Sequence, residues 1–195
     1  MKAATGRRAW TVNVAYLTLA GTATSVLIGA LLGQAGALLG LDGSGPVGLA
    51  LLLALIALAT AREVGWRAIP LPQARRQTGG IWARRLGLRT AAVLWGLDLG
   101  LFVTTWQTLA GAWLVPVLAV LAASPGFGAA LFAAHWLARA LSVWIAPLLL
   151  RGDAQIPQLL LALTQSQRAA QLVHVAALGW AALVVMTIVT QDGYI

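Results

Sequence analysis

Long apolar runs separated by short polar pieces form the main pattern along the 195-residue chain. The runs have a flat apolar profile rather than one polar face, which is typical of helices surrounded by lipid. We predict five membrane-spanning segments, at residues 11–40, 46–64, 90–122, 126–150 and 170–190. The longest polar piece between them is a basic loop at residues 65–89. The pattern therefore predicts an all-α bundle of transmembrane helices that forms a single integral membrane domain.

Two of the predicted segments, 11–40 and 90–122, are longer than one membrane crossing requires. Thirty helical residues extend over about 45 Å, whereas the hydrocarbon core of a bilayer is about 30 Å thick. Each segment must therefore tilt, protrude or break. Pro116 is a candidate break point in the second segment, because proline removes a helix hydrogen bond. Such a break leaves six spans open as the alternative to five.

Two parts of the chain resemble each other when the sequence is shifted by 80 residues. The shift aligns Thr24 with Thr104 and Gly48 with Gly128. Each copy has a basic flank, a long apolar segment, a short loop with serine, glycine and proline, and a second apolar segment. This pattern predicts a twofold internal repeat of a helical hairpin with one additional helix, and repeats are common in membrane carriers.

Composition and charge agree with a membrane protein. The chain is 60 % hydrophobic and 9 % charged, whereas a soluble domain is about 25 % charged. If the N-terminus is cytoplasmic, twelve of the thirteen basic residues fall on the cytoplasmic side, as the positive-inside rule requires. The net charge of +8 then has a topological cause, and we expect no nucleic-acid partner. The predicted location is the cell membrane, with a cytoplasmic N-terminus and an external C-terminus.

The residue inventory excludes several kinds of chemistry. The chain has no cysteine, which excludes disulfides, thiolate metal sites and thiol redox relays. It has no HExxH, GxSxG or phosphate-loop motif and no acidic cluster suited to a metal. We therefore predict that the protein is not an enzyme, and we predict no cofactor and no metal.

One acid and one base lie inside predicted spans. Asp98 is in the segment 90–122 and Arg139 is in the segment 126–150. A charge in hydrocarbon is unfavourable, so such residues usually face each other or a water-filled cavity. Counted from the cytoplasmic ends, the two depths differ by about 6 Å, which an arginine side chain can cover. We predict an Asp98–Arg139 pair that either fixes helix register or lines a substrate path.

Further polar residues are expected at a common depth past the midplane. His135 lies one helical turn from Arg139, and the same depth count groups side chains from both halves of the repeat. Each residue alone has a structural explanation, because hydroxyls bond to helix carbonyls and glutamine can join helices. Together they would suit a proton relay or a small polar substrate. The predicted layer contains His135, Thr104, Thr105, Gln107, Thr24 and Ser25.

A row of glycines in the first segment predicts close helix packing. Gly29, Gly33, Gly36 and Gly40 follow one another at helical spacing and share one face. Small residues allow two backbones to approach closely, which promotes helix association in lipid. We expect packing within the chain, with a homodimer interface as the alternative.

The stretch IPLPQARRQ…RRLGLRTAAVLWGLDLGLFVTTW is a basic cytoplasmic loop that enters a glycine-rich span with a polar break midway. This layout, over residues 11–150, resembles the cytochrome c biogenesis transmembrane family. The resemblance implies six spans in two inverted halves around a basic loop. The family carries reducing equivalents with one cysteine in the first span of each half. The comparable positions here hold Thr24-Ser25 and Thr104-Thr105, so the resemblance implies a scaffold without thiol chemistry.

Two functions remain after these steps. The first is a small transport or permease-like membrane protein, with Asp98, Arg139 and His135 along the path. The second is a non-catalytic accessory or assembly subunit of a membrane or redox complex, in which the charged pair is structural. The lipid bilayer is the expected partner in both cases, and a membrane protein partner or a homo-oligomer belongs to the second.

Overall fold

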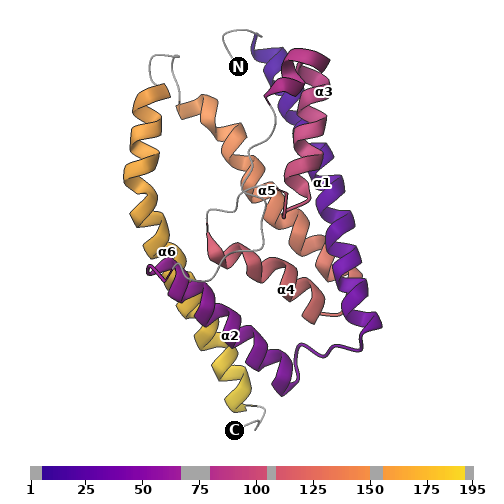
Figure 1. Cartoon of the computed structure of the whole chain (residues 1–195), viewed down its shortest axis with the longest axis vertical. Coiled ribbons are helices and arrows are strands. Elements are labelled where there is room, and N and C mark those ends of the chain that lie inside the picture. Colours follow the sequence, from indigo (N-terminus) through magenta and orange to yellow (C-terminus); the bar gives the residue numbers. More distant parts are fainter. Residues whose placement is uncertain (1–5, 67–79, 105–108, 150–155, 192–195) are drawn as a thin grey trace. The chain divides into compact units, whose positions relative to one another are not determined.

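The structure, a computed structural model, describes residues 6–66, 80–104, 109–149 and 156–191 (Figure 1). The described residues form helices and connecting turns, with no strand among them. The elements, in chain order, are α1 (Arg7–Leu38), α2 (Pro46–Glu63), α3 (Ile81–Gly100), the 3-10 helix η1 (Ala110–Trp113), α4 (Leu114–Leu121), α5 (Pro125–Leu149) and α6 (Ile156–Gln191). The all-α class predicted from the apolar runs is confirmed.

Among the described residues, four helices contain stretches long and apolar enough to cross a membrane: Arg8–Leu38, Pro46–Glu63, Pro125–Ile145 and Arg168–Thr187. No more than 28 % of any of these apolar windows is buried inside the protein. Leu172, Val173 and Trp180 on α6, for example, are each 71 % exposed. Apolar side chains that point outward along a whole helix require lipid around them. The helices therefore support a membrane-embedded protein.

The predicted third span, 90–122, is not one continuous helix. α3 ends at Gly100, residues 101–104 form turns and a bend, the next described helical element begins at Ala110, and α4 ends at Leu121. Pro116 is not the break point, because it lies in the first turn of α4, where a missing N–H removes no helix hydrogen bond. The prediction that this segment breaks at Pro116 was therefore wrong in position. The first long segment, in contrast, forms the unbroken helix α1.

Two further boundaries differ from the prediction. α3 begins at Ile81, inside the expected polar loop 65–89, and Gly87 within it has φ 80° and ψ 162°, a conformation that glycine adopts readily. α6 begins at Ile156, well before the predicted residue 170. Helices project beyond the hydrocarbon wherever their polar residues can reach water, so the apolar run marks only their membrane part.

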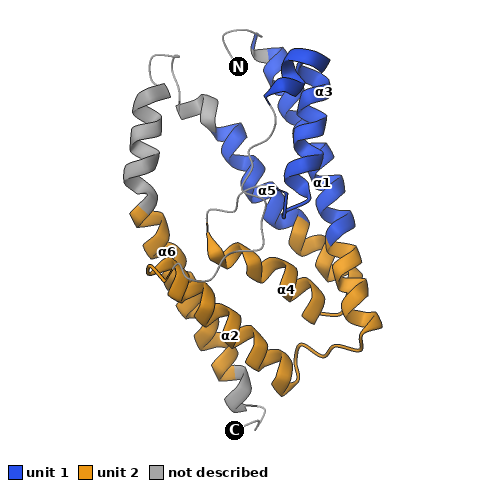
Figure 2. Cartoon of the chain, viewed as in Figure 1, with its two compact units in different colours: residues 1–28, 73–106, 133–165 blue, residues 29–72, 107–132, 166–195 orange. Residues whose placement is uncertain are grey.

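The chain forms two compact units (Figure 2). Unit 1 contains residues 1–28, 73–106 and 133–165, and unit 2 contains residues 29–72, 107–132 and 166–195. The helices α1, α5 and α6 each contribute one part to unit 1 and the other part to unit 2.

Unit 1 is held by close backbone approach among α1, α3 and α5. A Cβ at Gly96 of α3 would overlap the carbonyl oxygen of Leu17, and a Cβ at Gly100 would lie 2.6 Å from the carbonyl oxygen of Gly21. A Cβ at Gly21 would in turn overlap the indole of Trp136. That indole donates a hydrogen bond of 2.9 Å to the carbonyl of Thr18. Glycines are needed here because backbone or a large ring occupies the space of a side chain.

Unit 2 contains the glycine row of α1. Cβ atoms at Gly29, Gly33 and Gly36 would overlap the carbonyl oxygens of Gly128, Ser124 and Val120, respectively. Gly40 does not take part, because nothing lies within 4 Å of its Cβ position. Its φ of 62° instead ends α1, and Leu41 N–H donates back to the carbonyl of Gly36. Three of the four glycines therefore pack within the chain, as we expected, against residues 120–128.

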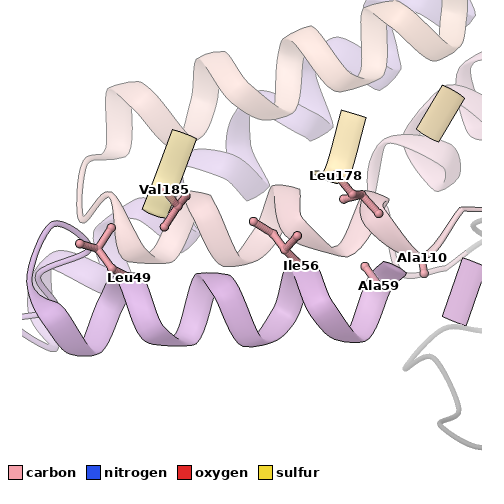
Figure 3. Packing of buried hydrophobic residues seen from close by; sticks show 6 residues of the cluster. All are labelled: Leu49, Ile56, Ala59, Ala110, Leu178 and Val185. Carbon is pink, nitrogen blue, oxygen red and sulfur yellow. The ribbon is translucent and has the colours of Figure 1, made fainter. Parts of the chain in front are cut away.

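The apolar core of unit 2 joins α2, η1 and α6 (Figure 3). Ile56 is 3 % exposed and Leu178 is 4 % exposed. The cluster consists of Leu49, Ile56, Ala59, Ala110, Leu178 and Val185. Alanines in two of the three elements allow the helices to lie close together.

The loop between α1 and α2 contains a carboxylate outside the spans. Asp42 Oδ1 accepts hydrogen bonds from Ser44 Oγ at 2.6 Å and from Ser44 N–H at 2.9 Å. The hydroxyl of Ser44, followed by its backbone N–H, lowers the pKa of Asp42 below its ordinary value of 3.8. The charged carboxylate is therefore the form that the folded loop favours.

The Asp42 carboxylate should make the stability of the protein depend on pH, and Asp42→Ala should remove that dependence. A folded pKa below the unfolded one contributes stability above pH 3.8, and the contribution is lost as the pH falls through the folded value. We expect wild type to unfold at a higher temperature than Asp42→Ala at neutral pH, with the gap closing below pH 3.8. Thermal unfolding in detergent over this range measures it. A difference in unfolding temperature that is constant with pH would contradict the expectation. Ser44→Ala removes the hydroxyl that donates to Asp42, so it should also lower the unfolding temperature at neutral pH and have less effect below pH 3.8.

The two halves of the predicted repeat form similar helices in one part and different backbone in another. Shifted by 80 residues, α2 overlaps α5, and proline begins both helices, at Pro46 and at Pro125. The same shift places the non-helical residues after Gly100 opposite the continuous middle of α1. The duplication itself stays a prediction.

Candidate functional site

The end of α3 inside an apolar segment is the first candidate site. A helix leaves its last carbonyls without helix partners, and hydrocarbon offers no donor to them. Here the carbonyl of Asp98 accepts a hydrogen bond of 2.5 Å from Thr104 Oγ1, and the carbonyl of Gly100 accepts one of 3.2 Å from Ser25 Oγ. Two hydroxyls from the predicted polar layer therefore cap this helix end. Phe102, with φ 66°, turns the chain away from the helix direction.

The other predicted layer residues lie nearby or outside the described chain. Thr24 Oγ1 donates to the carbonyl of Ala20 within its own helix, at 3.1 Å. The His135 ring packs 5.4 Å from the ring of Phe102, and among the described residues its Nε2 has no hydrogen-bond partner. Thr105 and Gln107 lie outside the described residues. Unit 1 thus gathers Thr24, Ser25, Thr104 and His135 around the end of α3.

The two intramembrane charges are both in unit 1. Asp98 is only 6 % exposed, and it has contacts of its own within the chain. Between these two described residues the structure has no Asp98–Arg139 ion pair. Arg139 instead lines a cavity of about 250 Å³ together with Trp136 and Ser142. The pairing stays a prediction, and the observed geometry gives the two charges different surroundings.

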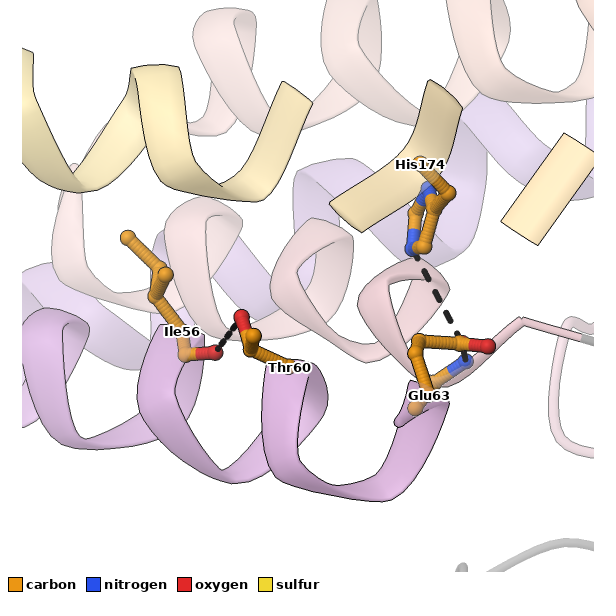
Figure 4. A network of polar contacts seen from close by, with 5 residues as sticks. Ile56, Thr60, Glu63 and His174 are labelled. Carbon is orange, nitrogen blue, oxygen red and sulfur yellow. Dashed lines mark hydrogen bonds and ion pairs between the residues drawn. The ribbon is translucent and has the colours of Figure 1, made fainter. Parts of the chain in front are cut away.

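A second polar site, in unit 2, was missed in the sequence (Figure 4). Glu63 is the last residue of α2, and its Oε1 accepts a hydrogen bond of 2.5 Å from the backbone N–H of Ala110. The same oxygen lies 3.9 Å from Nε2 of His174 on α6. The side chains are 5 % exposed for Glu63 and 21 % exposed for His174. A buried carboxylate thus meets both the start of η1 and an imidazole.

The surroundings of this pair are specific to its residues. A Cβ at Gly111 would overlap the His174 ring, so only glycine leaves room for the imidazole. A negative charge at the start of a helical segment is favourable because unpaired N–H groups point toward it. The sequence signal was an acid at the end of a span and a histidine inside another. Nothing in their spacing linked them, since the contact depends on how α2, η1 and α6 pack.

Within the described residues, no group of three or more histidine, cysteine, aspartate or glutamate side chains is placed to hold a metal ion. A comparison with protein-family models, with curated proteins and with solved structures finds no match to this chain. The functional argument therefore depends on the geometry of the sites themselves.

Proposed function

We propose that this chain is a small membrane transport protein whose polar path passes the end of α3. The observation that carries the proposal is a helix that stops inside an apolar segment, with the buried Asp98 in its last turn. Broken helices supply backbone carbonyls and dipole ends to substrates and ions in membrane carriers. Intramembrane acids mark such paths more often than they mark plain structural contacts.

The surroundings of the helix end support a path rather than a sealed break. Non-helical backbone at membrane depth is tolerated where it is buried in protein or lines a water-filled cavity. In unit 1, His135 packs against Phe102 beside the break, and Arg139 lines a cavity about one turn further along α5. On the proposed path, Asp98, His135 and Arg139 are the groups that a polar substrate or a proton would meet.

We infer five crossings with a cytoplasmic N-terminus in the cell membrane, the broken segment α3–α4 supplying the third. Two loops of unit 2 support this count. A Cβ at Gly43 would lie 2.5 Å from the carbonyl oxygen of Leu121, and Asp42 and Ala122 line one cavity. The loop after α1 and the loop after α4 are therefore neighbours. If α3–α4 returned to its starting side, these loops would lie on opposite faces of the membrane.

Cysteine accessibility tests the path, because the native chain has no cysteine. Single changes Ser25→Cys, Asp98→Cys, Thr104→Cys and His135→Cys are expected to react with a membrane-impermeant, water-soluble maleimide in intact inside-out vesicles, in which the cytoplasmic side faces the reagent. Labelling should be slower than for Arg84→Cys at the exposed start of α3, yet measurable. A transported substrate or ion should then protect these positions.

The matched control is Leu19→Cys, because Leu19 lies on α1 like Ser25 but is 67 % exposed, on a face that we expect lipid to cover. It should remain unlabelled, since the reagent does not enter hydrocarbon. Silence at all four test positions, with Arg84→Cys fully reactive, would contradict the transport proposal.

A second candidate function, an accessory or assembly subunit, is favoured by one specific observation. The hydroxyls of Thr24, Ser25 and Thr104 all donate to helix carbonyls, as they would in a dry, packed interior. In that role the polar groups are structural, and a lipid-exposed face such as that of α6 meets a membrane protein partner. Uniform silence in the labelling experiment would favour this candidate.

A further inference from the structure

The cavity around Arg139 carries one more inference. Arg139 lies in the apolar stretch Pro125–Ile145 of α5, and every described residue that lines the cavity beside it belongs to unit 1. Its described lining consists of Leu17 from α1, Leu99 from α3, and Trp136, Arg139, Ala140, Ser142 and Val143 from α5. Residues 136, 139, 140 and 143 follow helical spacing, so a single face of α5 forms one wall.

The described lining of this cavity carries positive charge only. Arg139 is the only charged residue among its described lining, and no described carboxylate forms an ion pair with it. A guanidinium keeps its charge in proteins and offers five N–H donors in a planar fork. A charge at this depth is unfavourable unless an opposite charge or water compensates it. The site therefore attracts anions and repels cations.

The walls determine what kind of anion fits. Leucine, valine, alanine and tryptophan side chains surround the arginine, so an apolar tail could stay in contact with the protein. A volume of about 250 Å³ corresponds to roughly eight water molecules, enough for one carboxylate or phosphate group and the first part of a chain. The Trp136 ring is fixed by its hydrogen bond to Thr18, which keeps one wall in place.

We propose that the Arg139 cavity of unit 1 binds the oxyanion of an amphipathic molecule, a carboxylate or phosphate group attached to an apolar tail. The guanidinium would donate paired hydrogen bonds to two oxygens, the geometry for which arginine is best suited. The inference rests on the proposed function in taking Arg139 as a path residue, and it names the substrate class. The oxyanion can come from a membrane lipid headgroup or from a free fatty acid.

Binding is measured on the full-length protein in uncharged detergent, with brominated fatty acid and its methyl ester as probes. The two have the same tail and differ only in the charge. Bromine quenches tryptophan at short range, and Trp136 in the wall reports occupancy, with Trp136→Phe supplying the background of the other tryptophans. The acid should quench Trp136 at lower concentration than the ester. Arg139→Gln should weaken acid binding about tenfold or more and leave ester binding unchanged.

A second variant keeps the charge and removes the space. Ala140→Leu fills the cavity from α5 and should also abolish the acid–ester difference, whereas Ala138→Leu, on an exposed position of the same helix, should not. Brominated phosphatidic acid and brominated diacylglycerol repeat the comparison for a lipid headgroup. Preference for phosphatidic acid alone identifies a lipid site, and preference for both acids identifies a general oxyanion site.

Equal quenching by acid and ester in the wild type would overturn the inference, as would a difference that survives in Arg139→Gln and Ala140→Leu. The proposed function fails separately, because it depends on cysteine labelling in vesicles rather than on binding in detergent. Positive labelling with equal quenching would retain transport and reject this substrate class.

Discussion

Glu63→Leu is expected to destabilise the protein by about 1 to 3 kcal/mol, the usual cost of leaving a buried hydrogen-bonding group without its partner. The change leaves the Ala110 N–H without its acceptor and His174 without its carboxylate, at a site where the Glu63 side chain is only 5 % exposed. Because His174 is 21 % exposed, the lower end of this range is expected. Unfolding in mixed detergent micelles, followed by helix signal, measures the loss.

The matched variant is Glu63→Gln, which keeps a carbonyl oxygen for Ala110 but removes the charge. It should cost less than Glu63→Leu, and the difference between the two measures the hydrogen bond to η1. His174→Gln combined with Glu63→Gln should lose less than the sum of the single changes, since both remove the same contact. Strictly additive losses, or equal stability of the leucine and glutamine variants, would show that the buried site does not hold α2, η1 and α6 together.

Gly96→Ala is expected to cost about 1 to 3 kcal/mol, because overfilling a packed contact forces the backbones to move apart. The new Cβ would overlap the carbonyl oxygen of Leu17 and lie 2.9 Å from Cβ of Ala20 and 3.0 Å from the backbone N of Gly21. A carbonyl in the middle of α1 cannot turn away without loss of helix hydrogen bonds. The result should be separation of α1 from α3 in unit 1.

Gly179→Ala is the control, because it adds the same methyl group to a helix where nothing lies within 4 Å of the Cβ position. There alanine should be neutral or stabilising by up to about 1 kcal/mol, since it favours helix more than glycine does. Both variants can be compared by thermal unfolding in one detergent. If Gly96→Ala proved as stable as Gly179→Ala, the close approach of α1 and α3 would be incorrect.

The ends of several helices could be predicted from the sequence, because the thickness of the surrounding lipid sets the length of the apolar run. A membrane helix needs a minimum apolar length, and apolar length is written directly in the residues. The predicted span 46–64 corresponds to α2 at Pro46–Glu63, and the predicted span 126–150 corresponds to α5 at Pro125–Leu149. The segment 90–122 was different, because its apolar run is continuous while the helix is interrupted after Gly100.

The break in that segment depends on contacts that hydropathy does not record. Proline was the strongest local signal, yet Pro116 lies inside α4, and α3 ends where Ser25 and Thr104 supply hydroxyls to its carbonyls. Ser25 belongs to a helix far away in the sequence. A helix can stop inside hydrocarbon only where another element satisfies its end, so the position of the break is a property of the packed structure.

Taken alone, the sequence indicated that lipid surrounds the helices. It also indicated the all-α class and the approximate ends of most apolar helices, because these depend on composition and on the length of the apolar runs. It also placed Gly29, Gly33 and Gly36 on one helix face, because helical periodicity is local. Only the tertiary structure brought Glu63 to Ala110 and His174, left Arg139 in an apolar cavity of unit 1, and gave Gly40 the role of ending α1. Those outcomes depend on which helix faces meet, and that choice results from the packing of distant side chains, which local pattern does not encode.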